Sequence, residues 1–141
     1  MGKSLIEIAK AVLQTEAESV LALKDRIDNN FDKVCNTLKS CRGKVILIGI
    51  GKSGHIAKKI SSTLASTGTP SFFLHPGEAG HGDLGMVTRD DVVIMISYSG
   101  EADEIVALLP GIKRMNAPII SMTGNVKSSI AKSSDFHLDV S

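Results

Sequence analysis

The sequence predicts the α/β fold class: a five-stranded parallel sheet sandwiched by helices, with two N-terminal helices ahead of it. Five continuous apolar runs indicate the strands, because strands covered on both faces do not alternate apolar with polar residues. These runs occupy residues 45–50, 72–74, 92–96, 118–122 and 136–140. Helix-length segments separate the runs, and this alternation is typical of right-handed parallel crossovers.

Residues 1–43 read as two helices. Apolar residues recur at steps of three or four over residues 3–29, which is the pattern of one helix face. That stripe consists of Ile6, Ala9, Leu13, Ala17, Val20, Leu23 and Ile27. A second helix is expected over residues 31–41, with Gly43 as its stop. The first helix carries more apolar surface than a small domain needs, so we expect part of it to pack on another subunit.

Residues 44–141 form the sheet core of a single domain that spans residues 1–141. No helix is expected after the fifth strand, which ends at Val140, so we expect part of one sheet face to lack a covering helix. Either a partner covers that part or the chain belongs to a longer protein, and we favour the longer protein. The helices expected within the core cover residues 53–67, 101–115 and 126–133.

The composition excludes several classes of function. The 141 residues carry a net charge of +1, which argues against a protein that follows nucleic-acid phosphates. Aromatic residues make up 4%, too few for a platform that stacks bases. Cys35 and Cys41 form neither a metal quartet nor a disulfide framework. The apolar runs are too short to cross a membrane, and none near the start has signal-peptide length, so we expect a cytoplasmic protein.

The first candidate binding loop reads GIGKSGH over residues 49–55, at the end of a strand where open parallel sheets bind ligands. Its GxGxxG pattern suggests a dinucleotide, but residues 74–76 offer no carboxylate for a ribose hydroxyl, and Ile46 breaks the P-loop pattern. The glycines still let the backbone approach an anion beside a helix N-terminus, and Lys52 adds a full charge. The residues expected to bind this anion are Gly51, Ser53 and Gly54.

The second candidate loop reads SYSGEADE over residues 97–104. Two hydroxyls, a glycine and a new helix N-terminus form a phosphate cradle without net charge. Ordinary N-capping by Ser99 explains one serine, but not the combination with the first loop. Two such loops on adjacent strands predict a phosphorylated small ligand. The residues expected to bind it here are Ser97, Ser99, Gly100 and Glu101.

The third candidate loop reads HPGEAGHGDLG over residues 75–85. Its many glycines cost folding stability, and such loops usually carry function. His75 and His81 offer metal ligands, but their spacing without a third clear ligand is weak support. Proton transfer beside a sugar suits a loop histidine better, because the imidazole pKa lies near neutrality. A purely structural role stays open for each histidine.

Together these segments resemble the sugar isomerase (SIS) domain. The resemblance rests on residues 49–55, 65–70, 75–78, 81–87 and 97–101. More narrowly, the chain is similar to bacterial D-arabinose-5-phosphate isomerases from about residue 2 to residue 141. The resemblance implies a flavodoxin-like strand order, a tetramer, and interconversion of D-ribulose 5-phosphate and D-arabinose 5-phosphate. That reaction feeds the synthesis of the lipopolysaccharide sugar Kdo.

The resemblance also implies roles for single residues, while no cofactor is expected to be required. The residues that match the family's motifs are Lys52 and Glu104 in the catalytic site, Gly68, Thr69 and His81 at the substrate, His75 at a zinc ion, and Ser97 and Ser99 at the phosphate. Ala102 departs from the family, because SIS domains usually carry Ser or Thr there. The family's further glutamate, its later histidine and its pair of CBS domains all lie beyond Ser141, so we expect impaired turnover by this chain.

An aldose–ketose isomerisation moves a proton between C1 and C2 through an enediol, which needs a base, an oxyanion donor and a phosphate anchor. We expect Lys52 to stabilise charge on the carbonyl oxygen or the phosphate, and His81 to shuttle protons. Glu104 is either an acid/base group or the residue that orients Lys52. The alternative is a non-catalytic SIS module that senses sugar phosphates, although residues 1–43 lack the basic recognition helix of such regulators.

Overall fold

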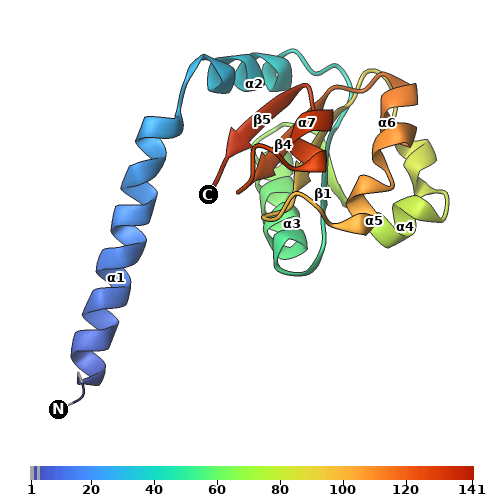
Figure 1. The fold of residues 1–141 in the computed structure, drawn as a ribbon. Helices are drawn as coiled ribbons and strands as arrows, with labels where there is room; N and C mark the ends of the chain where they lie inside the picture. Colours follow the sequence, from blue (N-terminus) through green and yellow to red (C-terminus); the bar gives the residue numbers. More distant parts are fainter. Residues whose placement is uncertain (1, 3) are drawn as a thin grey trace.

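The computed structural model describes residue 2 and residues 4–141 and contains one parallel sheet with the strand order β2-β1-β3-β4-β5 (Figure 1). This confirms both the predicted fold class and the flavodoxin-like order. Each predicted strand is present to within about one or two residues of its expected bounds. The strands are β1 (Val45–Gly49), β2 (Ser71–Leu74), β3 (Val92–Ile96), β4 (Ile119–Thr123) and β5 (Phe136–Asp139).

Helices cover both faces of the sheet, which explains the continuous apolar runs. Because side chains alternate across a strand, Ile46 and Ile48 of β1 enter one core while Val45 and Leu47 enter the other. The Ile46 face packs against α4 (Pro76–Gly80), α5 (Asp103–Val106), α6 (Leu109–Met115) and α7 (Ser129–Ser133). The Val45 face packs against α2 (Asn29–Lys39) and α3 (Gly51–Ser66).

The predicted helix over residues 3–29 is wrong in its extent. Helix α1 (Leu5–Ala22) begins with a capping box between Ser4 and Glu7, and a 3-10 turn (Leu23–Arg26) follows it. The chain then becomes extended at Ile27, because Asp28 caps α2 by accepting a hydrogen bond from the Asn30 amide. The expected start at residue 3 lies outside the described residues.

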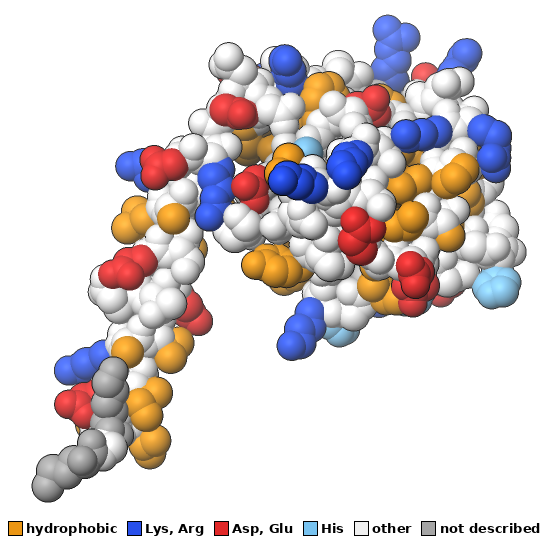
Figure 2. Space-filling model, in the orientation of Figure 1, with side chains coloured by type: hydrophobic (Ala, Val, Ile, Leu, Met, Phe, Trp, Pro, Cys, Tyr) orange, Lys and Arg blue, Asp and Glu red, His pale blue; other side chains and the backbone are white. Residues whose placement is uncertain are grey.

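Helix α1 projects away from the sheet, and none of its residues is buried (Figure 1). Apolar side chains lie along it between charged ones (Figure 2). Leu13 and Val20 of the predicted stripe are 66% and 67% exposed. No helix in the described part of the chain combines the length and apolar character that a membrane crossing requires.

Other helix boundaries also differ from the prediction. The helix expected over residues 101–115 is two helices, α5 and α6. Pro110 has no N–H group to donate the hydrogen bond that would continue the first helix. The loop over residues 75–85 contains α4 and a 3-10 turn (Asp83–Met86). Helix α3 begins at Gly51, and α7 is shorter than the segment expected over residues 126–133.

Asp91 ties the amino ends of β1 and β3 together. Its side chain is 0% exposed and accepts hydrogen bonds from the Lys44 amide (2.7 Å), the Lys44 ammonium (3.2 Å) and the Thr88 amide (2.8 Å). This arrangement requires glycine at position 43, because a Cβ there would lie 2.2 Å from an Asp91 oxygen. Gly43 is therefore not the helix stop predicted above, and α2 ends earlier, at Lys39.

Burial raises the pKa of the Asp91 carboxyl, but the hydrogen bonds from Lys44 and Thr88 outweigh burial and hold the pKa below its usual value. We expect Asp91→Asn to lower the free energy of unfolding by about 2–3 kcal/mol, because an amide nitrogen would face N–H donors. A lowered folded pKa means that the stabilisation is complete above about pH 4 and is lost as the pH falls through that folded pKa.

Urea unfolding between about pH 7 and pH 3 measures this contribution. The wild type and Asp91→Asn should converge in stability at the acidic end. Asp90→Asn is the matched control, because Asp90 is exposed and should leave the stability unchanged. A difference between wild type and Asp91→Asn that stays constant over the whole pH range would contradict the assignment.

Candidate functional site

Four connections meet at the carboxyl edge of the sheet, after β1, β2, β3 and β4. The loops after β1 and β3 are neighbours, because these strands pair in parallel with Gly49 opposite Ile96. The strand order reverses between β1 and β3, since the chain continues from β1 to β2 on one side and to β3 on the other. Open parallel sheets bind ligands in the crevice at such a switch point. The structure thus brings the first two predicted loops together.

The first loop turns tightly from β1 into α3. The Gly49 and Gly54 backbones approach so closely that a Cβ on Gly54 would lie 2.9 Å from the Gly49 carbonyl oxygen. Gly51 has a φ of +56°, which favours glycine. Lys52 is exposed and Ser53 is half-buried in the first turn of α3. The loop therefore presents the N-terminus of a 16-residue helix at the crevice.

A cavity of about 280 Å³ lies between this loop and the end of β2. Sequence reasoning missed two cationic or titratable residues there, His55 and Lys58. The Lys58 ammonium lies 5.1 Å from the centre of the Phe73 ring, a cation–π contact. Their spacing of three residues on α3 is the signal that places them on one side of the helix. The lining residues are Gly49, Gly51, Gly54, His55, Lys58, Phe73 and His75.

The serine hydroxyls of the second loop close turns in their own segment. The buried Ser97 hydroxyl accepts from the Gly100 amide (3.2 Å), and the exposed Ser99 hydroxyl accepts from the Glu101 amide (3.2 Å). Each hydroxyl acts as acceptor there, so its proton remains able to donate to an anion. Ser99 is not a helix cap: Ala102 occupies the N-cap of α5 without a side-chain hydrogen bond.

The structure gives Glu101 a different environment from the one predicted. Its carboxylate accepts a hydrogen bond from the Ser129 amide at the start of α7 (2.8 Å). Hydrogen bonds from the Ser129 hydroxyl and amide, with the charge of Lys132, lower the pKa of Glu101. A carboxylate has no proton to donate and repels phosphate. The structure thus ties the Glu101 side chain to α7, and its contact with the phosphate stays a prediction.

The third segment holds its histidines by backbone contacts. The His75 ring is the N-cap of α4: its Nδ1 accepts from the Gly77 amide (3.1 Å). A neutral ring that accepts at Nδ1 carries its proton on Nε2. His81 is exposed and lies at the C-terminal end of α4. The described residues contain no group of three or more possible metal ligands, so the expected zinc position does not fit a closed site.

Gly68 and Thr69 lie away from the other predicted site residues. They precede β2, so that strand separates them from the carboxyl edge by about 13 Å. The Gly68 amide donates to Ala65 and the Thr69 amide donates to Leu64, which is the Schellman motif that ends α3. Within one chain these two residues therefore end a helix and do not join the crevice, and their substrate contact stays a prediction.

Lys52 and Glu104 occupy the first turns of α3 and α5. Both are exposed. Among residues 2 and 4–141 the one ion pair joins Lys44 to Asp91, so Glu104 does not orient Lys52 through a salt bridge here. Both roles of Glu104, an acid/base group or the residue that orients Lys52 in the presence of substrate, stay predictions.

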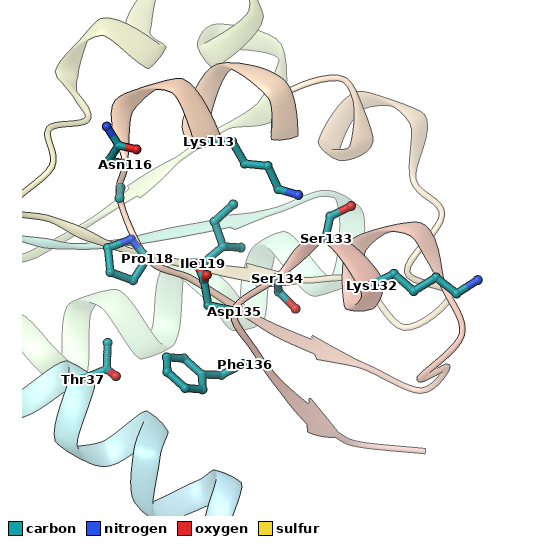
Figure 3. Close-up of a pocket in the computed structure, with 11 residues that line it drawn as sticks. Thr37, Lys113, Asn116, Pro118, Ile119, Lys132, Ser133, Ser134, Asp135 and Phe136 are labelled. Atoms are coloured by element: carbon teal, nitrogen blue, oxygen red, sulfur yellow. Dashed lines mark hydrogen bonds between the residues drawn. The ribbon is translucent and has the colours of Figure 1, made fainter.

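A larger cavity, of about 640 Å³, lies at the opposite edge of the sheet, where β4 and β5 begin. Figure 3 shows Lys113 reaching over Ile119 toward Ser133, while Lys132 points outward. None of the predicted site residues lines this cavity. Its walls come from Thr37, Lys113, Asn116, Ala117, Pro118, Ile119, Lys132, Ser133, Ser134, Asp135 and Phe136.

An open parallel sheet with glycine- and hydroxyl-bearing loops at its switch point defines a class of α/β domain that binds anionic ligands at the carboxyl edge. A model of the SIS domain matches residues 37–141. The chain belongs to the SIS domain family.

Relatives of known name are close in sequence. The chain is 54% identical over 139 residues to arabinose 5-phosphate isomerase KdsD of Escherichia coli K12, which covers 99% of this chain and 42% of the relative. A solved structure of an Escherichia coli CFT073 protein in complex with arabinose 5-phosphate is 45% identical, with a TM-score of 0.83, over 98% of this chain and 75% of that one. A candidate phosphosugar isomerase of capsule formation from Bacteroides fragilis is 38% identical, with a TM-score of 0.92, over 97% and 73%.

Gly100 carries the shape of the second loop, and Gly100→Ala tests it. Its φ is +67°, and an added Cβ would lie 2.1 Å from the Ser128 hydroxyl oxygen. We expect the free energy of unfolding to fall by about 2 kcal/mol or more, as measured by urea denaturation. Gly80→Ala is the control, because nothing lies within 4 Å of the added Cβ and its φ is not positive. Equal losses in both variants would show that Gly100 is not constrained as described.

Proposed function

We propose that this domain binds a pentose phosphate between the loops after β1 and β3. We also propose that it interconverts D-ribulose 5-phosphate and D-arabinose 5-phosphate through an enediol. The adjacency of the two loops carries the proposal, because it gives one anionic group a helix N-terminus and two hydroxyls, with the lysine of the first loop beside them. The identity to KdsD and the likeness to the arabinose 5-phosphate complex support the choice of sugar. The chain spans 42% of the length of KdsD.

In this proposal the phosphate lies between the two loops. The Ser97 and Ser99 hydroxyls donate their protons to its oxygens, and the amides at the start of α3 contribute partial positive charge. Gly51 and Gly54 allow the backbone close approach, with Ser53 beside them. The anchor uses no charged side chain, and its positive charge is the partial charge at the N-terminus of α3.

The chemistry falls to exposed side chains around this anchor. Lys52 stabilises the negative charge that develops on the carbonyl oxygen of the open-chain sugar. Glu104 moves the proton between C2 and C1, and His81 exchanges protons with the sugar hydroxyls. His75 is not used, since its Nδ1 already serves the cap of α4. The proposed chemistry uses no zinc ion, because the described residues form no group of three possible ligands.

A non-catalytic SIS module that senses sugar phosphates is the competing function. Both functions need the phosphate anchor, so phosphate binding does not separate them. Only an enzyme exchanges the C2 proton of D-arabinose 5-phosphate with solvent, because the exchange requires a working base. Glu104 lies in the first turn of α5, which follows the second loop, and a carboxylate at that place favours the enzyme.

Proton exchange in deuterium oxide tests the proposal. The C2 proton signal of D-arabinose 5-phosphate should disappear with the wild-type chain, as followed by proton NMR. Lys52→Met and Glu104→Gln should each slow the exchange by roughly 100-fold. Lys59→Met is the control on the same helix, where Lys59 contacts Thr63 at the surface. Binding of the sugar phosphate without any exchange, both by this chain and by one extended past the family's further glutamate and histidine, would establish the sensing module instead.

We propose that the protein acts in the cytoplasm as a homo-oligomer, a tetramer as the resemblance implies, supplying a precursor of the lipopolysaccharide sugar Kdo. The apolar stripe of α1 supports the association, because none of the residues of α1 is buried within one chain. Burying exposed Leu and Val side chains between copies contributes about 1.5–3 kcal/mol each.

Light scattering after gel filtration tests the oligomer. We expect the double variant Leu13→Glu/Val20→Glu to lower the molar mass toward that of the 14.9 kDa chain, because two charges would enter the buried stripe. Gln14→Glu adds a charge on the polar side of α1 and should leave the mass unchanged. A wild-type mass equal to the monomer would contradict the association.

A further inference from the structure

Glu101 belongs to the loop that we propose to hold phosphate, yet its carboxylate accepts a hydrogen bond from the start of α7. Glu101 and Ser129 are 28 positions apart, and the carboxylate reaches the Ser129 amide across the space between two connections of the carboxyl edge. Ser129 is the first residue of α7. The side chain of Glu101 therefore connects the β3–α5 loop to the β4–α7 segment.

Backbone hydrogen bonds fix most of the same loop from the same side. The Ser97 amide donates to the Met122 carbonyl (3.1 Å), the Gly124 amide donates to Tyr98 (2.8 Å), and the Ile130 amide donates to Gly100 (3.1 Å). Packing adds to them: a Cβ on Gly124 would lie 2.8 Å from the Tyr98 ring. Residues 97, 98 and 100 are thus held by segment 122–130.

Ser99 has no such direct tie in the described part of the chain. It is exposed, and its hydroxyl is oriented by accepting the Glu101 amide (3.2 Å). A chain of contacts therefore runs from the Ser129 amide to the Glu101 carboxylate and, through the Glu101 backbone, to the Ser99 hydroxyl. The position of this hydroxyl depends on where Glu101 is anchored.

We propose that Glu101 is a positioning residue: its bond to Ser129 anchors the end of the loop, so that the Ser99 hydroxyl faces the phosphate of the ligand. This inference rests on the proposed function, because it takes the loop to be the phosphate anchor. The hydrogen bonds from Ser129 lower the pKa of Glu101, so the carboxylate stays ionised and keeps its anchor well below neutral pH.

Two variants remove the bond from opposite ends. Glu101→Ala deletes the acceptor, and Ser129→Pro deletes the amide donor. Proline is tolerated at the first position of a helix, and Ser128 already has the extended backbone (φ −66°, ψ 160°) that precedes a proline. Glu101→Gln keeps an oxygen that can accept from Ser129 while removing the charge. Asp103→Asn is the control. Asp103 is exposed and lies two residues after Glu101, so the substitution removes an equal charge nearby.

The measurements are the dissociation constant for inorganic phosphate and the steady-state constants for D-arabinose 5-phosphate. Glu101→Ala and Ser129→Pro should each raise the dissociation constant and the KM about tenfold and leave kcat within about twofold. Glu101→Gln should bind phosphate to within about threefold of the wild type, and Asp103→Asn should bind it as the wild type does. The double variant should be no weaker than either single one, because both remove the same bond.

Several results would overturn the inference. Unchanged phosphate binding in Glu101→Ala would show that the bond positions nothing. Tighter binding in both Glu101→Ala and Glu101→Gln would show that the carboxylate acts only by repelling the ligand. A collapse of kcat in Glu101→Gln would make Glu101 a chemical group. Additive losses in the double variant would place the two side chains in separate roles.

Failure of the proposed function looks different. Failure of the phosphate anchor is visible in the wild-type chain, which would then not bind phosphate, and the positioning role would fall with it. A wild type that binds phosphate without reacting would contradict the isomerase activity alone. If the wild type binds phosphate, the dissociation constants of the variants decide whether Glu101 has the positioning role. Amide hydrogen exchange gives a readout without ligand: Ser129 should lose protection in Glu101→Ala, while Gly124 on the same segment should keep it.

Discussion

The parallel pairing of β1 with β3 is the constraint on which the binding edge depends. The register sets Gly49 opposite Ile96, so both strands end at the same level and their loops start side by side. The following helices leave on opposite faces, because Ala57 of α3 and Ile105 of α5 enter different cores. A crevice between the two loops follows from this divergence, whatever the ligand is.

Much of the fold was predictable because its strands are buried on both faces. A run such as residues 92–96 has no polar position to mask it, and the structure finds β3 at those residues. Helix ends were less predictable. The break at Ile27 and the division at Pro110 depend on short-range hydrogen bonding, and an apolar period of three or four continues across both.

Within the candidate site, the sequence indicated which loops meet but not what each side chain contacts. Loop positions follow from strand ends, which apolar patterning reveals. The partner of Glu101 lies on a connection 28 residues later, and no local pattern connects them. For Gly68 and Thr69 a motif match predicts a substrate contact, whereas within one chain their backbone amides end α3 at the other edge of the sheet.

The two loops differ in how much order they have before a ligand arrives. Gly100 packs against Ser128, and the surrounding backbone is tied to β4 and α7, so the hydroxyl loop is set in advance and binding need not order it. Lys52 is exposed and makes no ion pair in the described residues, so it keeps its side-chain freedom. In the proposed isomerisation this division is useful. The phosphate charge is constant and suits a fixed cradle, whereas the charge on the sugar oxygen appears only during the reaction and suits a lysine that can move toward it.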